Sequence, residues 1–366
     1  MVRRLAIVLA VLGSAHYYIW LRFVAAPHLP EPWYALATVA LAGLAPSLIV
    51  AALVTRRLPR ARAAPLLRVV YTWFGIAVYL LLAAALGDLA CALAPIGART
   101  AALAGLVGVA ATVLYGFLHV ARGPRVRRVR VPLAKLPASA DGYTIVQLTD
   151  VHVGPSLGRE FVTRVVEQVM ALAPDLIVLT GDVVDGRLAD LAPHVEPLRD
   201  LHARDGVFAV TGNHEYYWNA DAWIAHLSSL GIRFLRNERV SIASGFELAG
   251  VDDSTAAAMA AGHGEDVPRA LAGRDPERPV VLLAHHPRTI ARAVAAGCDL
   301  QLSGHTHGGQ LLPLGWLARL FEPRVAGLAR FGATWLYVSE GTGFWGPPLR
   351  VGTTSEITLL TLHRPA

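Results

Sequence analysis

Carboxylate, imidazole and amide side chains gather in five short stretches of this sequence. The stretches are Asp150-Val151-His152, Gly181-Asp182-Val183-Val184-Asp185, Gly212-Asn213-His214-Glu215, His285-His286-Pro287 and Gly304-His305-Thr306-His307-Gly308. Such a mixture of oxygen and nitrogen donors suits Mn, Fe or Zn better than Mg or a metal held by thiolates. The sequence therefore predicts a metal-dependent active site.

Taken singly, the stretches differ in how strongly they indicate a metal. Asp-x-His and Gly-Asp-x-x-Asp also occur in ordinary turns, because Gly and Asp are common turn residues. Two histidines two residues apart and flanked by glycines have little packing purpose, whereas they suit a metal bound by imidazoles. The joint occurrence of all five at strand ends makes a purely structural explanation improbable.

The elements that must position these side chains follow an α/β pattern. We expect strands at 143–149, 175–180, 207–211, 247–251, 279–284, 299–303 and 335–339. We expect helices at 159–172, 188–203, 221–229 and 288–296. Alternation of this kind predicts an α/β sheet domain. Each polar stretch follows one of these strands, and the carboxyl ends of the strands line the ligand crevice of such a sheet.

In this order, the five stretches resemble the motifs of the calcineurin-like metallophosphoesterase superfamily over about residues 140–362. The sequence is most similar to the membrane-associated bacterial branch of YkuE-like and YaeI-like phosphoesterases, some of whose relatives cleave UDP-diacylglucosamine. The resemblance implies two facing mixed β-sheets flanked by helices. Asp185 is followed by Gly186 and then Arg187, whereas the protein Ser/Thr phosphatases place Arg directly after this Asp, which argues against a protein phosphatase.

The resemblance also implies a ligand set and a mechanism. Two divalent metal ions (Mn, Fe or Zn) would lie about 3.5–4 Å apart, with Asp182 as the bridge. The first metal would be held by Asp150, His152, Asp182 and His307, and the second by Asp182, Asn213, His285 and His305. A hydroxide bridging the two metals would attack phosphorus. Asp182 and His214 are the expected catalytic residues, because His214 would stabilise the developing charge or protonate the leaving oxygen.

Three assignments stay open at this point. A shift of one residue would exchange His285 for His286, although the His-x-Pro spacing favours His285. Asp185 is either a partner that orients a histidine or a simple loop residue. Arg350 ends a glycine-rich tail and either binds a substrate phosphate or lies on the surface of a packed loop.

The N-terminal third has a different composition. The whole chain is 54% hydrophobic and only 16% charged, which indicates lipid-facing segments. Apolar stretches near 5–26, 33–54, 67–94 and 101–121 are each long enough to cross a bilayer core of ~30 Å. We therefore expect a transmembrane region at 1–122, a basic linker and first strand at 123–139, and a phosphoesterase domain at 140–366. The alternating Arg-Val run at 125–131 predicts a half-buried strand.

Arginines flank the apolar stretches in a pattern that predicts topology. They cluster before the first stretch, after the second and after the fourth, at Arg3, Arg4, Arg56, Arg57, Arg60, Arg62, Arg122, Arg125, Arg127, Arg128 and Arg130. By the positive-inside rule, both ends and the catalytic domain should be cytoplasmic in a multi-pass protein of the cell membrane. The first stretch also resembles a signal peptide, but the spans that follow favour an uncleaved anchor. Because these arginines lie beside apolar segments rather than aromatic residues, no nucleic-acid polymer is expected as partner.

The leading hypothesis is hydrolysis of a lipid-linked or membrane-derived phosphoester or pyrophosphate, with the lipid bilayer as the partner. One alternative is a membrane-anchored phosphodiesterase for soluble nucleotides. A second is a membrane sensor or carrier with a regulatory phosphoesterase domain, although the candidates for ionisable groups inside the membrane are few: His16, Arg22 and Asp88. Arg22 could reach the interface and Asp88 could be satisfied near a helix end. The sequence identifies no protein partner.

Overall fold

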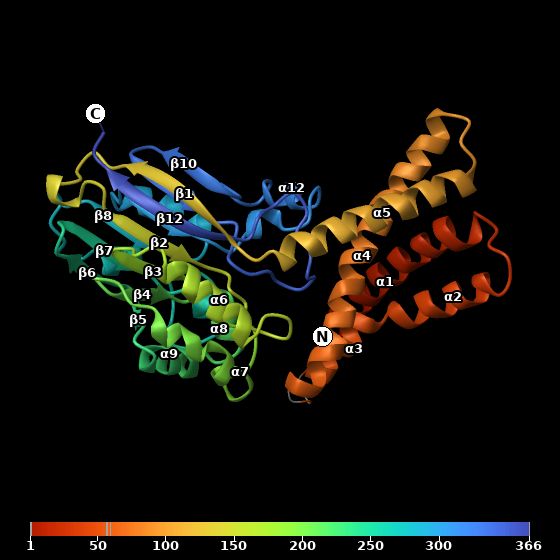
Figure 1. Cartoon of the computed structure of the whole chain (residues 1–366), viewed down its shortest axis with the longest axis horizontal. Helices are drawn as coiled ribbons and strands as arrows, with labels where there is room; N and C mark the ends of the chain where they lie inside the picture. Colours follow the sequence, from red (N-terminus) through yellow and green to blue (C-terminus); the bar gives the residue numbers. More distant parts are fainter. Residues whose placement is uncertain (1, 56–57, 59, 366) are drawn as a thin grey trace. The chain divides into compact units, whose positions relative to one another are not determined.

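The protein is described by a computed structural model that covers residues 2–55, 58 and 60–365 (Figure 1). By its internal contacts the chain forms two compact units. The first contains Met1–Ala121 and Gly346–Val351, and the second contains Arg122–Trp345 and Gly352–Ala366. Arg56 and Arg57, which contributed to the predicted topology, lie outside the described residues.

The first unit is helical. Its elements are α1 (Val2–Trp20), the π-helix η1 (Leu21–Ala25), α2 (Trp33–Leu44), α3 (Ser47–Thr55), α4 (Arg60–Leu93) and α5 (Ala98–Ala121). Four helical segments are long and apolar enough to cross a membrane: Ala6–Ala25, Trp33–Leu53, Arg62–Leu93 and Ala98–Ala121. Large apolar side chains such as Val39, Leu86 and Val107 are exposed on them, as expected where the solvent is lipid. The prediction of four long apolar helices is confirmed.

Polar residues inside this unit are paired with one another. Arg22 Nε lies 2.9 Å from Asp88 Oδ1, and the Tyr18 hydroxyl donates to Asp88 Oδ2 at 2.5 Å. Trp73 Nε1 donates to His16 Nε2 at 3.0 Å. We expected Arg22 to reach the membrane interface and Asp88 to be satisfied near a helix end. Instead, Arg22 of η1 and Asp88 of α4 form an ion pair, and this pairing lowers the free-energy cost of placing either charge in lipid.

A distant segment of the chain, Gly346–Val351, returns to the helical unit. Leu349 is fully buried, a Cβ atom added at Gly75 of α4 would collide with it, and one added at Gly116 of α5 would lie tightly against Val351 and Leu349. The backbone N–H of Arg350 donates to Gly116 O at 3.4 Å. The two glycines therefore provide the space that this loop occupies against the helices.

The second unit consists of two six-stranded mixed sheets. In spatial order, the first sheet contains β1 (Arg125–Pro132), β12 (Glu356–His363), β2 (Thr144–Leu148), β3 (Leu176–Thr180), β4 (Val207–Val210) and β5 (Arg233–Phe234). The second contains β10 (Gly327–Phe331), β11 (Thr334–Val338), β9 (Leu300–Ser303), β8 (Val280–Leu283), β7 (Phe246–Gly250) and β6 (Glu238–Ile242). Strands β2 to β5 run parallel, as do β7, β8, β9 and β11.

The two sheets share one buried core. Ile145 and Val178 of the first sheet belong to the same apolar cluster as Leu283, Leu302 and Tyr337 of the second. The sheets therefore face each other, which confirms the predicted architecture.

Helices connect the strands and cover the outer faces. The connections between β2 and β5 contain α6 (Arg159–Met170), α7 (Leu188–Val195), η3 (Glu196–Asp200), α8 (Asn213–Tyr217) and α9 (Ala220–Ser229). Buried residues of α10 (Val267–Ala270) and α11 (Ile290–Ala295) form an apolar cluster with the second sheet. The remaining short helices are η2 (Ala138–Ala140), η4 (Ala256–Ala258), η5 (Pro287–Thr289), η6 (His307–Gly309) and α12 (Gly315–Ala318).

Three predicted elements differ from the structure. The helix expected at 288–296 begins as the 3-10 helix η5, and only Ile290–Ala295 is α-helical. The helix expected at 188–203 ends at Val195 and continues as the 3-10 helix η3, because Pro197 has no N–H to donate into a continuing α-helix. The strand at 125–131 exists as β1, but its first four residues are exposed rather than alternately buried. β1 is an edge strand that pairs only with β12 among the described residues.

Candidate metal centre

The predicted ligands lie at the carboxyl ends of strands in both sheets. Asp150 and Asp182 each follow by two residues the end of a parallel neighbour, β2 and β3, and Asn213 begins α8 just after β4. In the second sheet, His285 follows β8, and His305 follows the adjacent parallel strand β9. Parallel neighbours end at the same edge, so each sheet contributes a row of ligands.

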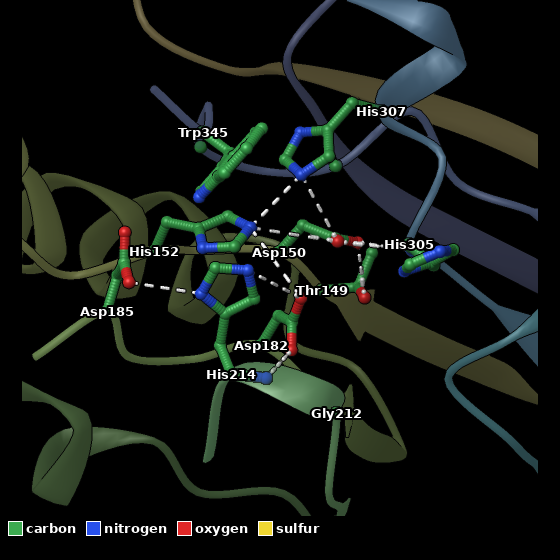
Figure 2. Close-up of polar contacts among 12 residues, drawn as sticks. Thr149, Asp150, His152, Asp182, Asp185, Gly212, His214, His305, His307 and Trp345 are labelled. Atoms are coloured by element: carbon green, nitrogen blue, oxygen red, sulfur yellow. Dashed lines mark hydrogen bonds and ion pairs between the residues drawn. The ribbon is translucent and has the colours of Figure 1, made fainter. Parts of the chain in front are cut away.

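The first group of donors surrounds His152 (Figure 2). Its Nε2 atom lies 3.0 Å from His307 Nε2 and 3.8 Å from Asp182 Oδ2. His307 Nε2 lies 3.4 Å from Asp150 Oδ1. Asp150, His152 and His307 offer ligand atoms that all lie within 4.8 Å of one another. The structure therefore brings together the four residues predicted for the first metal.

The second group surrounds His285. Its Nε2 atom lies 3.2 Å from Asp182 Oδ2, and its Nδ1 atom donates to Thr180 O at 2.8 Å. When Nδ1 carries the proton, Nε2 presents a lone pair to the site. Asp150, Asp182 and His285 again offer ligand atoms within 4.8 Å of one another. Asp182 Oδ2 therefore contacts both groups.

The two remaining predicted ligands of the second metal, Asn213 and His305, belong to loops that contact the two carboxylates: the N–H of His214 donates to Asp182 Oδ1, and the N–H of His305 donates to Asp150 Oδ2. Asn213 is 7% exposed, its Nδ2 donates to the Tyr217 hydroxyl at 3.2 Å, and its Oδ1 has no hydrogen-bond partner among the described residues. The His305 ring lies 5.2 Å from that of His285, measured between centroids.

The geometry distinguishes His285 from His286. His286 Nε2 lies 3.3 Å from Asp253 Oδ2, and its ring lies 3.7 Å from that of His305. His285, and not His286, approaches Asp182. The alternative favoured by the His-x-Pro spacing is the one that the geometry supports.

Backbone strain is concentrated at these residues. Positive φ angles occur at Asp150 (51°), His152 (48°), Asp182 (53°), His305 (70°) and His307 (52°). The left-handed region is unfavourable for residues with a Cβ atom and persists where the surroundings enforce it, commonly at functional sites.

Motif glycines make room for the two carboxylates. A Cβ atom at Gly212 would collide with the side chain of Asp182, and one at Gly304 would collide with those of Thr149 and Asp150. The glycines in these motifs therefore serve close packing against the ligands as well as turning the chain.

Glu215 has a structural role that the motifs alone did not reveal. Its Oε2 atom accepts from the backbone N–H groups of Gly212 at 2.7 Å and Asp182 at 3.0 Å. Its Oε1 atom accepts from those of Val183 at 2.8 Å and Val184 at 3.3 Å. One buried carboxylate thus ties the loop after β3 to the loop after β4. The signal in the sequence was an acidic residue directly after Asn213 and His214, which were assigned to metal binding and catalysis.

His214 is oriented by Asp185. His214 Nδ1 lies 3.0 Å from Asp185 Oδ1, which also accepts from Trp218 Nε1 at 3.1 Å. The other ring nitrogen, Nε2, lies 4.0 Å from Asp182 Oδ2 and so faces the ligand groups. Of the two alternatives for Asp185, the structure favours the histidine-orienting partner.

The electrostatics of the site fit these roles. Burial lowers the pKa of His152 to about 3 and that of His305 to about 2, so both imidazoles are neutral, as metal binding requires. Burial alone would raise the pKa of Asp182, but His285 and His214 outweigh it and hold this pKa well below its usual value. Burial alone would lower the pKa of His214, but Asp182 and Asp185 raise it to about 9.

These residues fit divalent cations. Asp150 and Asp182 are almost completely buried, and two carboxylates so close together need positive charge nearby. Asn213 Oδ1 is a buried acceptor without a hydrogen-bond partner among the described residues, and His285 Nε2 lies 3.2 Å from Asp182 Oδ2. A buried set of carboxylate, amide and imidazole groups whose donor atoms face one another is typical of a metal site.

The glycine-rich tail divides between the two units. Trp345 is 50% exposed, its ring lies 6.0 Å from that of His214, and its backbone exchanges two hydrogen bonds with the side chain of Gln310, at 2.8 and 3.1 Å. Arg350 is fully buried in the segment Gly346–Val351 that clusters with the helices. Its role as a substrate ligand stays a prediction.

Comparison with known proteins places the chain in a family. The calcineurin-like phosphoesterase family matches residues 143–309. A Danio rerio protein named "Transmembrane protein with metallophosphoesterase domain" is 39% identical over 270 residues, which cover 71% of this chain and 62% of that relative. An uncharacterized metallophosphoesterase of Aquifex aeolicus is 35% identical, covering 65% of this chain and 91% of the relative. The uncharacterized metallophosphoesterase YkuE of Bacillus subtilis is 31% identical, covering 62% and 81%.

The alignment spans only about three-fifths of the Danio rerio relative, 62% of its length. The bacterial matches cover most of their own chains, and the name of the Danio rerio relative agrees with the apolar helices found here. With the Asp and His clusters at its strand ends, this chain belongs to the calcineurin-like metallophosphoesterase family, in its YkuE-like branch.

Proposed function

We propose that the chain hydrolyses a phosphoester or pyrophosphate bond of a lipid-linked substrate, with two divalent cations, at the cytoplasmic face of the cell membrane. The observation that carries the proposal is the position of Asp182. Its Oδ2 atom lies 3.8 Å from His152 Nε2, which follows a strand of the first sheet, and 3.2 Å from His285 Nε2, which follows a strand of the second. A bridging carboxylate requires this position.

The predicted ligand sets describe how the two cations would be held. Asp150, His152, Asp182 and His307 would hold the first, and Asp182, Asn213, His285 and His305 the second. Mn, Fe or Zn suits these donors. When bound, the cations would supply Lewis-acid activation of the attacking water and of the phosphoryl oxygens.

The second set would have to lose a proton before it could hold a cation. Burial alone would lower the pKa of His285, but the charge of Asp182 raises it well above its usual value. The imidazole must give up this proton before Nε2 can serve as a ligand. The raised pKa of His285 therefore indicates that positive charge is favourable at its position beside Asp182.

His214 would act on the leaving oxygen. Asp185 holds the ring at Nδ1, so Nε2 faces the ligand groups and carries the transferable proton. The raised pKa of His214 keeps that proton in place at neutral pH. A general acid of this kind contributes roughly 10²–10⁴-fold to a rate.

The membrane region supports a lipid substrate. Four helical segments can cross a bilayer, and the arginines that flank the corresponding stretches of the sequence favour a multi-pass topology with the phosphoesterase unit in the cytoplasm. A substrate with a soluble head and acyl chains, such as a UDP-diacylglucosamine-like pyrophosphate, would meet the active site at that surface.

The test compares substrate classes with the full-length protein in proteoliposomes. We expect turnover of UDP-diacylglucosamine in the bilayer that exceeds turnover of a soluble nucleotide phosphodiester at matched concentration. Asp182→Ala should lose both metal ions and both activities. Hydrolysis of soluble nucleotides alone would reject the lipid substrate and favour a membrane-anchored nucleotide phosphodiesterase. Full turnover by metal-free protein would reject the metal mechanism.

A further inference from the structure

Large apolar side chains are exposed just after the last metal-ligand motif. In Leu314–Phe321, here called the apolar loop, the exposed fractions are 39% for Leu314, 56% for Trp316, 56% for Leu317, 75% for Leu320 and 68% for Phe321. Exposed apolar residues are ordinary when scattered, but a contiguous group commonly marks an interaction site.

The apolar loop is held in this conformation by contacts at its base. A Cβ atom at Gly315 would collide with the backbone of Gly309, so these two glycines pack directly on each other. Arg288 Nε donates to Phe321 O at 3.0 Å and forms an ion pair of 3.0 Å with Glu322. The exposure of the apolar side chains is therefore a property of an anchored loop.

Within the loop, helical hydrogen bonds order the side chains. The N–H of Leu320 donates to Leu317 O at 3.0 Å, and the N–H of Phe321 donates to Ala318 O at 3.0 Å, which extends the turn of α12. Residues three and four positions apart lie on the same face of such a turn. Leu317, Leu320 and Phe321 consequently project together.

The charge around the apolar loop is positive. Arg319 within it and Arg324 just after it are exposed, whereas the charge of Arg288 at its base is balanced by Glu322. Trp, Leu and Phe combined with Arg are the residues that bind the interface of an anionic bilayer.

A cavity of about 410 Å³ connects the apolar loop with the metal-ligand motif. Trp316, Arg319 and Arg324 line it on the side of the loop, and Gly308, next to the ligand His307, lines it on the other side. Glu322 and Glu340 also face it. A polar group held there would lie between the apolar loop and the ligands.

The short connection between α5 and β1 favours the bilayer as the partner of the apolar loop. Only Arg122, Gly123 and Pro124 separate α5, a candidate membrane span, from β1 of the phosphoesterase unit. Three residues extend at most about 10 Å, so the unit cannot move far from the bilayer. A lipid surface is therefore always close to the unit that carries the apolar loop.

We infer that the apolar loop inserts its side chains into the interface of an anionic bilayer. Insertion would bring the cavity beside Gly308 to the level of lipid headgroups. This consequence for the substrate rests on the proposed function, but insertion itself does not.

The test measures the depth of a spin label on the full-length protein in nanodiscs. Cys91 is replaced by Ala, and Cys298 is left in place because it is 2% exposed and burial raises its pKa to about 12, which keeps it unreactive. The label is attached at Leu320→Cys. Met259→Cys, an apolar residue in another loop that is 41% exposed, is the matched control.

We expect the label at 320 to collide more often with oxygen than with a water-soluble nickel complex, and the label at 259 to do the reverse. Adding phosphatidylglycerol to phosphatidylcholine discs should deepen the label at 320, and Arg319→Gln should reduce that effect. Equal accessibility of both labels to the nickel complex would overturn the inference. A label at 320 shielded from both reagents would also overturn it and would indicate a second copy of the chain on this face. This experiment does not measure hydrolysis, so a negative result would reject membrane insertion without rejecting the proposed function.

Discussion

At the scale of single residues, type and spacing predicted the ligand groups that the structure brings together. Asp182 and His285 approach each other within 3.2 Å although about a hundred positions separate them in the sequence. The roles of Asp185 and Glu215 could not be assigned in the same way. Both depend on partners supplied by a different strand, and a carboxylate that binds a backbone N–H looks in sequence like any other acidic residue.

Asp185→Asn should alter the pH dependence of turnover. The charge of Asp185 helps to raise the pKa of His214 to about 9, and the neutral amide removes that contribution. If protonated His214 is the acid, activity falls as pH rises through its pKa, so the alkaline limb of the kcat profile should move to lower pH. Bound cations would lower the absolute value, and the prediction concerns the difference between variants.

Asp190→Asn is the matched control, since Asp190 pairs with Arg187 on the surface three residues away. Its pH profile should follow the wild type. His214→Ala should lose the alkaline limb together with roughly 10²–10⁴-fold in kcat. An unchanged alkaline limb in Asp185→Asn would exclude His214 as the group that titrates there.

At the scale of elements, strands buried on both faces were the most predictable. β3, β8 and β9 are fully buried strands that end at polar motifs, and their predicted bounds lie within one residue of those observed. β5 was missed, because a two-residue strand has no periodicity to detect. β12, which pairs with both β1 and β2, was missed although it is long, because nothing in its sequence indicates that the end of the chain enters the middle of a sheet.

Glu215→Gln should weaken the connection between β3 and β4. The Glu215 carboxylate accepts hydrogen bonds from four backbone N–H groups, two at each oxygen. In the Gln variant an NH₂ group replaces one oxygen and cannot accept, so at least two of these backbone N–H groups lose their partner. Unpaired buried donors cost about 1–3 kcal/mol each. We expect a lower Tm of the full-length protein in detergent and weaker binding of Mn or Zn, measured by metal titration.

Glu167→Gln, on the exposed face of α6, is the control for this change. It should keep the Tm and metal affinity of the wild type. Retention of both properties by Glu215→Gln would show that the four backbone hydrogen bonds do not position the ligand loops.

At the scale of the whole molecule, composition predicted the division between an apolar helical part and an α/β part. Four apolar stretches gave four helical segments with nearly the expected bounds. The assignment of Gly346–Val351 to the helical unit could not be predicted, because it depends on the space that Gly75 and Gly116 leave on two separate helices. Glycine is frequent in membrane-spanning helices, so these two positions do not stand out in the sequence.

The proposed topology leads to a whole-molecule prediction about accessibility. With both ends in the cytoplasm, the loop between α4 and α5 faces the opposite side of the membrane from the phosphoesterase unit. In the Cys91→Ala background, a membrane-impermeant thiol reagent added to intact spheroplasts should label Gly97→Cys in that loop. It should label Ala243→Cys, an exposed position between β6 and β7, only after lysis. The reverse pattern would place the active site outside the cell and remove cytoplasmic lipid precursors as substrates. Labelling of both sites before lysis, with the reagent shown not to enter, would instead place both loops on the outer side and so reject the four-span topology.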